Sequence, residues 1–513
     1  MKRLLAPALL CAALTACGST VQVTGSATTS PDGLGGPAAS SDSGTTSGGA
    51  AQLPGDVTSG AGTSTTGTVN GTTGTTGGSA PAATTGTGST TGAALPTPGS
   101  IPLKGPGWDA HTVYIGITTQ QDVQTVAESF GINSVDSGNQ KADVEALLAE
   151  YNSRGGLFGR RLKGVYYDVK SAGNADTQGQ AACATFTQDN RVVAVYAAAL
   201  VADTPGFRTC MAKARIPVMA GGGQAFDDKV FSDLQGWYDL MTFPSWNRFT
   251  PHFVDRLVAQ DYFSGWNTTL GAASKATPTK VGFLCPDTPI GHRVGALITR
   301  ELTRVGHRPD DATYYATSNA DVTGYVLRFK ADGISHVLFC DLGLFVFAEQ
   351  AESQHYRPRY GVSTFNTPVL FLQGLVPDAQ LAGAVGSGFT PTLDVDDAHD
   401  PGPAAMPAAV ACAKIGAKHG VSYAPDKRLA RGILYDTCDI IGLIVAAAKS
   451  VNALDGVAMR RGIGLEGTRL RSALTFSSGL SPTVHAMPAS TRDVFFQDAC
   501  KCFQYRGPLL PMR

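Results

Sequence analysis

Apolar runs of strand length alternate with apolar positions of helical period from about residue 111 onward. Residues 113–118 form a short apolar run, and Val144, Leu147, Leu148 and Tyr151 then follow the i, i+3, i+4, i+7 spacing of a helix with one buried face. Further strands are predicted at 164–169, 192–198 and 217–220, with helices at 176–189 and 204–214 between them. This alternation predicts a parallel sheet covered by helices on both faces.

The same alternation starts again after Phe243-Pro244-Ser245. Strands are predicted at 280–285, 312–316, 336–340 and 360–364, and a helix carries Val294, Leu297, Ile298, Leu302 and Val305. Residues 432–449 are apolar nearly all round, which is typical of a helix buried between other elements. The sequence therefore predicts an α/β protein with two halves.

The N-terminal residues have the three regions of an export signal. Lys2 and Arg3 precede an apolar stretch at 4–14, and Leu14-Thr15-Ala16-Cys17 ends the segment with small residues before a cysteine. This end resembles the lipobox of bacterial lipoproteins, which implies a signal peptide over 1–16 and a lipid, such as palmitate, on Cys17. The alternative is an ordinary cleaved signal peptide with an incidental cysteine.

Residues 17–106 consist mainly of Gly, Ser, Thr, Ala and Pro, and contain only four charges (Asp32, Asp42, Asp56 and Lys104). Such a segment cannot bury enough apolar area to offset its ordering entropy, so we expect a disordered tether. After a lipid anchor, a tether of this length suits a protein that stands off a membrane. The alternative is a low-complexity tail without a mechanical role.

Overall charge excludes one class of partner. The chain has 40 Lys+Arg against 41 Asp+Glu, and charged residues make up 16% of it. Nucleic-acid binding requires a basic surface, so we expect no nucleic acid as partner. No internal run of about 20 apolar residues is present to cross a bilayer as a mature helix.

Most of residues 110–510 resembles type I periplasmic binding proteins, and the order of the matching segments carries the resemblance. The segments are Tyr114-Ile115-Gly116-Ile117, Asn152 to Arg161, Tyr167-Asp168, Ile216-Pro217-Val218, Ile290-Gly291, Gln350-Ala351, Tyr356-Arg357-Pro358 and Tyr435-Asp436. The subgroup most similar is the leucine-, isoleucine- and valine-binding type, the receptors of ABC importers.

This resemblance implies a Venus-flytrap with two parallel-sheet lobes, three hinge crossings and a small-molecule ligand in the cleft. Lobe 1 is expected at 107–244 plus 368–482, and lobe 2 at 245–367 plus 483–513. It also implies a lipid-anchored, extracytoplasmic solute-binding protein, without enzymatic activity or cofactor, that serves an ABC permease. The alternative is a non-transport ligand sensor or cell-envelope interaction protein on the same fold.

Ligand-binding candidates follow from strand ends, because ligands of open parallel sheets bind beyond the carboxyl ends of strands. The candidates are Thr118, Thr119, Gln120, Ala199, Leu200, Gly222, Gly223, Gln224, Asp287, Thr288, Asp341, Ser363 and Thr364. Either Asp287 or Asp341 could pair with an ammonium group, whereas strand-end Asp, Ser and Thr also commonly cap the following helix. Asp168 is expected to be structural.

The loop after the third strand departs from the amino-acid-binding subgroup. That loop is rich in serine in the family, but here residues 197–202 read Ala-Ala-Ala-Leu-Val-Ala. The sequence therefore gives weaker support for a ligand with a free α-carboxylate, and a more apolar ligand is an alternative. Leu200, Trp237, Tyr238, Phe345 and Phe347 are candidates for an apolar cleft lining or for core positions.

Eight cysteines remain after Cys11 and Cys17, an even number that suits disulfides in an oxidising compartment. We expect Cys183 to pair with Cys210, since helices before and after one strand lie on one face of the sheet when the strand order continues in one direction. We also expect Cys412–Cys438 on neighbouring helices and Cys285–Cys340 at adjacent strand ends. Cys500 and Cys502 remain, for which a structural role is favoured over metal binding.

No catalytic motif is visible. Gly462-Ile463-Gly464-Leu465-Glu466-Gly467 fits G-x-G-x-x-G, but it follows a predicted helix rather than a strand, so we interpret it as a helix-to-helix loop. The nine histidines are scattered without metal-ligand spacing, and we expect no metal site.

Overall fold

The computed structural model describes residues 101–122, 136–171, 173–198, 204–221, 226–309, 312–317, 319–340, 343–371, 376–395, 398 and 406–512. The predicted signal peptide, Cys17 and most of the predicted tether lie outside them. The folded part begins earlier than the tether boundary at residue 106 suggests. The buried Trp108 donates from Nε1 to the carbonyl of Pro102 at 2.9 Å, and Arg160 Nη2 donates to the same oxygen at 3.0 Å.

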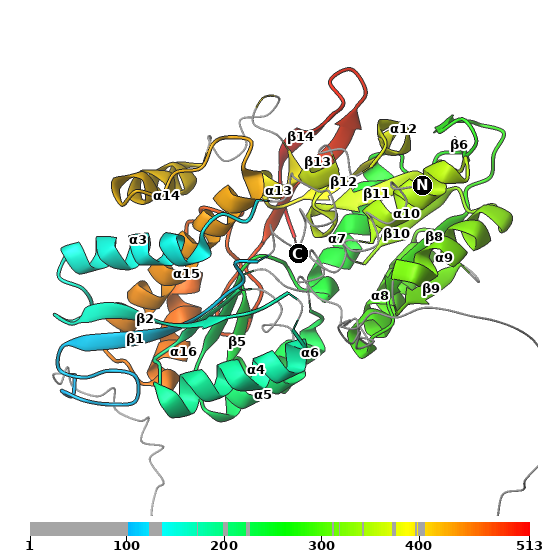
Figure 1. Ribbon diagram of the computed structural model, residues 1–513. Helices are drawn as coiled ribbons and strands as arrows, with labels where there is room; N and C mark the ends of the chain where they lie inside the picture. The colour runs from blue at the N-terminus through cyan, green and yellow to red at the C-terminus, as the bar shows by residue number, and fades with distance from the viewer. Residues whose placement is uncertain are drawn as a thin grey trace, which may run out of the picture. The chain divides into compact units, whose positions relative to one another are not determined.

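The first sheet is parallel throughout and has the strand order β2-β1-β3-β4-β5. Its strands are β1 (Thr112–Thr119), β2 (Arg161–Asp168), β3 (Val195–Ala198), β4 (Val218–Gly221) and β5 (Tyr238–Leu240). The first four confirm the predicted strands. Figure 1 shows this sheet with helices on both of its faces.

Alternate residues of each strand pack against opposite helix layers, as a sheet buried on both faces requires. In β3, Val195 and Ala197 pack with one helix layer, and Tyr196 and Ala198 pack with the other. The first layer comprises α4 (Ala175–Ala184) with the π-helix η2 (Thr185–Asp189), α5 (Pro205–Lys213) and α6 (Asp228–Asp233). The second comprises α3 (Gln140–Ser153), α14 (Pro407–Lys418), α15 (Arg428–Val451) and α16 (Gly456–Gly467).

The second sheet has the order β14-β13-β12-β11-β10-β8-β9, in which β13 runs antiparallel to both of its neighbours, β12 and β14, and the other neighbouring pairs are parallel. Its strands are β8 (Val281–Pro286), β9 (Thr313–Ala316), β10 (His336–Phe339), β11 (Arg359–Ser363), β12 (Val385–Gly388), β13 (Ser490–Gln497) and β14 (Cys502–Pro511). A separate hairpin pairs β6 (Trp266–Asn267) with β7 (Ala272–Ala273).

Helices also cover both faces of the second sheet. Phe283 of β8 packs toward α7 (Trp246–Ala259) and α8 (Pro289–Arg304), whereas Leu284 packs toward α9 (Asn319–Ala331) and α10 (Leu344–Ser353). Short helical turns complete this half at η4 (Thr364–Asn366), α11 (Pro368–Leu370), α12 (Asp378–Leu381) and α13 (Pro391–Asp394). The two-lobed α/β fold expected from the sequence is thereby confirmed.

The chain passes between the two sheets three times. It leaves the first sheet after β5, returns after β12, and leaves again after α16. The return comes later than residue 368, where the sequence-based boundary placed it, because β12 pairs with β11 and β13. Val385-Gly386-Ser387-Gly388 contains two glycines and one large apolar residue, so it has no strand pattern to recognise.

Gly462-Ile463-Gly464-Leu465-Glu466-Gly467 lies within α16, so its interpretation as a loop was wrong. The glycines serve close packing: a Cβ at Gly462 would lie 2.4 Å from the carbonyl oxygen of Ala447 on α15, and one at Gly467 would lie 2.5 Å from Leu480 Cβ. Among the described helices, none is by itself long and apolar enough to cross a membrane; α15 and α16 reach that composition only as a pair bent by 109°.

The described cysteines form four disulfides. Three join the pairs expected from the sequence, Cys183–Cys210, Cys285–Cys340 and Cys412–Cys438. The fourth joins Cys500 and Cys502 at the turn between β13 and β14. The Cys183–Cys210 bridge ties α4 to α5, and Cys285–Cys340 ties the carboxyl ends of β8 and β10.

Candidate functional site

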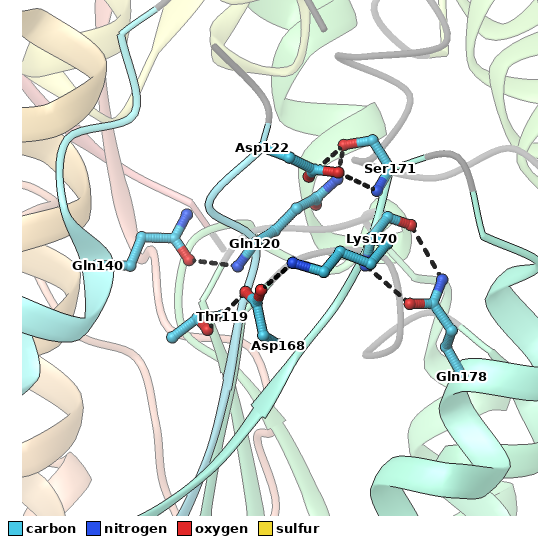
Figure 2. Close-up of polar contacts among 8 residues, drawn as sticks. All are labelled: Thr119, Gln120, Asp122, Gln140, Asp168, Lys170, Ser171 and Gln178. Atoms are coloured by element: carbon cyan, nitrogen blue, oxygen red, sulfur yellow. Dashed lines mark hydrogen bonds and ion pairs between the residues drawn. The ribbon is translucent and has the colours of Figure 1, made fainter. Parts of the chain in front are cut away.

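Polar side chains meet at the carboxyl ends of β1 and β2 (Figure 2). Thr119 Oγ1 donates to Asp168 Oδ1 at 3.1 Å, and Asp168 also forms an ion pair with Lys170. Gln120 Nε2 donates to Ser171 Oγ at 2.7 Å, and Ser171 in turn donates to Asp122 from its backbone and its hydroxyl group at 2.9 and 2.7 Å. These contacts fix the β1 and β2 ends relative to one another.

The described strand-end candidates of the first sheet are buried and already have protein partners. Thr118 Oγ1 donates to the carbonyl of Ala198 at the end of β3, and the backbone N–H of Gln120 donates to Gln140 Oε1 at 2.8 Å. Thr118, Thr119 and Gln120 are each no more than 1% exposed. Their side chains therefore shape the edge of the sheet, and Asp168 has a structural role in this network.

The described candidates of the second sheet already have hydrogen-bond partners within the protein. Thr288 caps α8 by accepting from Gly291 N at 3.0 Å, and Asp287 Oδ1 lies 2.6 Å from His292 Nε2. Asn366 Oδ1 accepts from Ser363 N at 2.9 Å, and Thr364 Oγ1 accepts from Phe389 N at 2.8 Å. Of these four, only Asp287 keeps an open side chain, 42% exposed, at the carboxyl edge.

Six candidates lie outside the described residues: Ala199, Leu200, Gly222, Gly223, Gln224 and Asp341. All thirteen positions stay predictions as ligand contacts. Of the five candidates for an apolar lining, Trp237, Tyr238, Phe345 and Phe347 are at most 8% exposed and lie in the core.

Asp436 is a buried acid at the same edge that strand-end reasoning did not find. It lies on α15 against the last residue of β4: a Cβ at Gly221 would lie 1.5 Å from Asp436 Oδ2, so only glycine fits there. Tyr196 of β3 donates to Asp436 Oδ2 at 3.0 Å, while Asp436 Oδ1 has no hydrogen-bond partner among the described residues. Burial, and secondarily the neighbouring Asp439 carboxyl, raises the pKa of Asp436 to about 8.

A second buried acid, Asp394, stands where the chain leaves the second sheet. Asp394 Oδ2 accepts from Tyr505 OH at 2.5 Å and from Thr390 N at 3.0 Å. Burial raises the pKa of Asp394 to about 7, against the opposing effect of these hydrogen bonds. The hydroxyl groups of Thr390 and Thr392 nearby have no hydrogen-bond partner within the described part of the chain, and both residues are fully buried.

Among the described residues, an ion pair joins the two halves directly. Asp227, the N-cap residue of α6, accepts from both Nε and Nη2 of Arg293 on α8, the latter at 2.8 Å. Asp227 is 4% exposed. A bidentate pair with one buried partner is among the stronger charge contacts in proteins, so it constrains how the halves lie. The two residues are 66 positions apart in the sequence, so no local sequence pattern predicts the contact.

Comparison with known proteins identifies the relatives of this arrangement. The profile of the family described as "Periplasmic binding protein" matches residues 131–473. Comparison with curated proteins gives no match.

Several solved structures have the same fold. A branched-chain amino acid ABC transporter protein from Thermus thermophilus with bound valine is 13% identical, with a TM-score of 0.56 over 78% of this chain and 96% of that one. A fatty acid ABC transporter substrate-binding protein from Thermomonospora curvata is 13% identical, with a TM-score of 0.55 over 80% and 96%. A possible leucine/isoleucine/valine-binding protein from Rhodopirellula baltica SH 1 is 14% identical, with a TM-score of 0.54 over 80% and 98%.

Proposed function

The chain belongs to the periplasmic binding protein family, and from this premise we propose that it is a lipid-anchored receptor that captures a small organic molecule between its two lobes for an ABC importer. The family consists of extracytoplasmic solute-binding proteins and not of enzymes. Its members associate with ABC transporters. The observation that carries the proposal is the family match over 131–473, together with two parallel-sheet halves joined by three crossings.

In a two-lobed receptor, closure of the lobes signals to the permease that a ligand is bound. A ligand that contacts both lobes favours the closed arrangement over the open one by its difference in affinity for the two. Closure then presents a different surface to the permease. The ligand class stays open between an amino acid and a more apolar molecule, because the structural neighbours include a valine complex and a fatty acid receptor.

The function is tested with a ligand panel. Amino acids, amides, sugars, aromatic acids and fatty acids are added to the secreted protein, and its melting temperature is measured. At least one class should raise the melting temperature in a concentration-dependent manner, because a ligand that binds only the folded state stabilises it by mass action. A panel without any shift, or turnover of a bound compound, would contradict the proposal.

The anchor is tested separately at Cys17. Acyl chains contribute about 0.8 kcal/mol per buried CH₂, so a multiply acylated Cys17 holds the protein on a membrane without a spanning helix. Cys17→Ala should move the protein from the membrane fraction to the soluble extracytoplasmic fraction. Cys11→Ala, a cysteine change within the signal, serves as the control and should leave the distribution unchanged. Membrane retention of the Cys17→Ala protein would argue against lipidation.

A further inference from the structure

Arg208 is a buried cation for which the described residues supply no anionic partner. It lies in α5, is 6% exposed, and its guanidinium carbon stands 4.4 Å from the ring centroid of Phe226. Nη1 of Arg208 has no hydrogen-bond partner, and within the described parts of the chain no carboxylate forms an ion pair with it. The nearest acid in sequence to Phe226 is Asp227, and both of its oxygens are taken by Arg293.

The contact with Phe226 does not compensate the burial of this charge. A cation–π contact is a weaker attraction than a charge-assisted hydrogen bond to an anion. Withdrawing an ion from water is unfavourable even after the protein relaxes. The Arg208 guanidinium therefore keeps a capacity to bind an anion that the described groups of this chain do not fill.

Arg208 stands at the edge where a ligand is expected. Its helix follows β3 and begins at the capping residue Thr204, whose hydroxyl accepts from Phe207 N at 3.4 Å. Long side chains on a helix lean toward its N-terminus, which here is the carboxyl edge of the first sheet. Phe226 follows β4 at the same edge, and its carbonyl accepts from Trp246 N, 2.9 Å away on α7 of the other half.

The N-terminus of α5 adds to the attraction for negative charge. Backbone N–H groups and the helix dipole make such an end electropositive. Arginine presents a planar fork that matches a carboxylate through two parallel hydrogen bonds. The buried guanidinium and the helix end therefore act on the same kind of group.

We propose that Arg208 binds the carboxylate of the ligand, so that this receptor selects organic acids over their uncharged analogues. The inference rests on the proposed function and narrows its ligand class. Residues 197–202 lack the serines that are found at this loop in the family. In this protein the Arg208 side chain, from the helix that follows the loop, would take over their role.

The test compares each acid with its amide by titration calorimetry on the mature protein. The probe pairs are 4-hydroxybenzoate and 4-hydroxybenzamide, octanoate and octanamide, and L-valine and L-valinamide. The native protein should bind the acid of at least one pair about 30-fold more tightly than the amide, as expected for charge-assisted hydrogen bonds. Arg208→Gln should weaken acid binding by about 30-fold and leave amide binding within about threefold.

Two further variants guard against loss of folding. Arg208→Lys keeps the charge and loses the fork, so it should fold and bind the acid about tenfold more weakly than the native protein. Arg328→Gln removes an exposed arginine that lies 4.9 Å from the Tyr314 ring on the second half, and it should change nothing. Melting curves confirm that each variant is folded.

The outcomes separate this inference from the proposed function. Equal binding of acid and amide, or an acid preference that survives in Arg208→Gln, would overturn the role of Arg208 and leave the receptor function standing. Binding of sugars or other uncharged compounds alone would do the same. Failure of every acid, amide and uncharged compound to bind would count against both.

Discussion

At the scale of single residues, buried acids distinguish this protein. Asp143, Asp394, Asp436 and Asp439 are all at most 4% exposed, and burial raises the pKa of each. Asp439 accepts from the Ser472 hydroxyl and from Ala473 N, whereas one oxygen of Asp436 accepts from none of the described groups. Of the two acids on α15, Asp436 and Asp439, Asp436 is therefore the one that more strongly favours the protonated form.

This difference predicts the pH dependence of stability. The pKa of Asp436 is about 8 in the folded protein and 3.8 as its ordinary value, so folding takes up a proton between these pH values. Its contribution to stability is complete below about pH 4 and is lost as the pH rises through about 8, at no more than about 1.4 kcal/mol per pH unit. Asp436→Asn keeps an acceptor for Tyr196 and should flatten this part of the profile.

Chemical denaturation of native and Asp436→Asn proteins at pH 5, 6, 7 and 8 measures the effect. The variant should gain stability relative to the native protein as the pH rises. Asp168→Asn is the control, because Asp168 is a partly exposed, ion-paired acid at the same edge. If the stability of Asp436→Asn instead changes with pH in the same way as that of the native protein, Asp436 is ionised in the folded protein.

Strand-end reasoning located Thr118, Thr119 and Gln120 because it needs only a local apolar run and the polar residues after it. It could not locate Asp436 against Gly221 or Arg208 over Phe226, since each contact depends on how separate elements pack. Asp436 bonds to Tyr196, which lies 240 positions earlier. A buried arginine and an exposed one have the same appearance in a sequence.

At the scale of elements, the predictions succeeded where one strand or helix has a continuous apolar pattern. β1, β8 and α15 are examples, and their patterns follow from burial on both faces of a sheet or within a helix layer. β12 and α16 were missed because glycines dominate them, and glycine signals a turn unless a close neighbour explains it. In α16 that neighbour is α15.

The packing of α16 predicts opposite effects for two helical glycine substitutions. Gly462→Ala places a methyl group 2.4 Å from the Ala447 carbonyl oxygen and should lower the free energy of unfolding by about 1–3 kcal/mol. Gly324→Ala on the exposed side of α9 meets nothing within 4 Å and should raise it by about 0.5–1 kcal/mol. Urea denaturation measures both. Equal effects would mean that α16 has room to shift away from α15.

At the scale of the whole molecule, the resemblance predicted two lobes and three crossings, and both are present. It did not predict which contacts hold the lobes. The third crossing lies beside β5 through hydrogen bonds of Leu240 with His485 and Met487, both 2.8 Å, and Arg248 of α7 donates to Ala486 at 2.8 Å. The Asp227–Arg293 pair adds a side-chain link near the first crossing.

Breaking that link should loosen the two halves. Arg293→Gln leaves the buried Asp227 carboxylate without its cation, which should lower stability by about 1–3 kcal/mol and favour more open arrangements. Small-angle X-ray scattering should then give a larger radius of gyration without ligand. Lys229→Gln breaks an exposed pair with Asp233 on α6 and should leave the scattering unchanged. An unchanged radius for Arg293→Gln would show that the backbone crossings alone set the arrangement.

The Cys285–Cys340 bridge has a practical consequence for anyone who assays this receptor. It joins the carboxyl ends of two neighbouring strands, β8 and β10, directly before the candidate residue Asp287. Protein made in a reducing cytoplasm would lack this disulfide, and the ends of β8 and β10 would adopt several conformations. Affinities from such a preparation would be averages over unequal receptors, so export during production is part of measuring what this protein recognises.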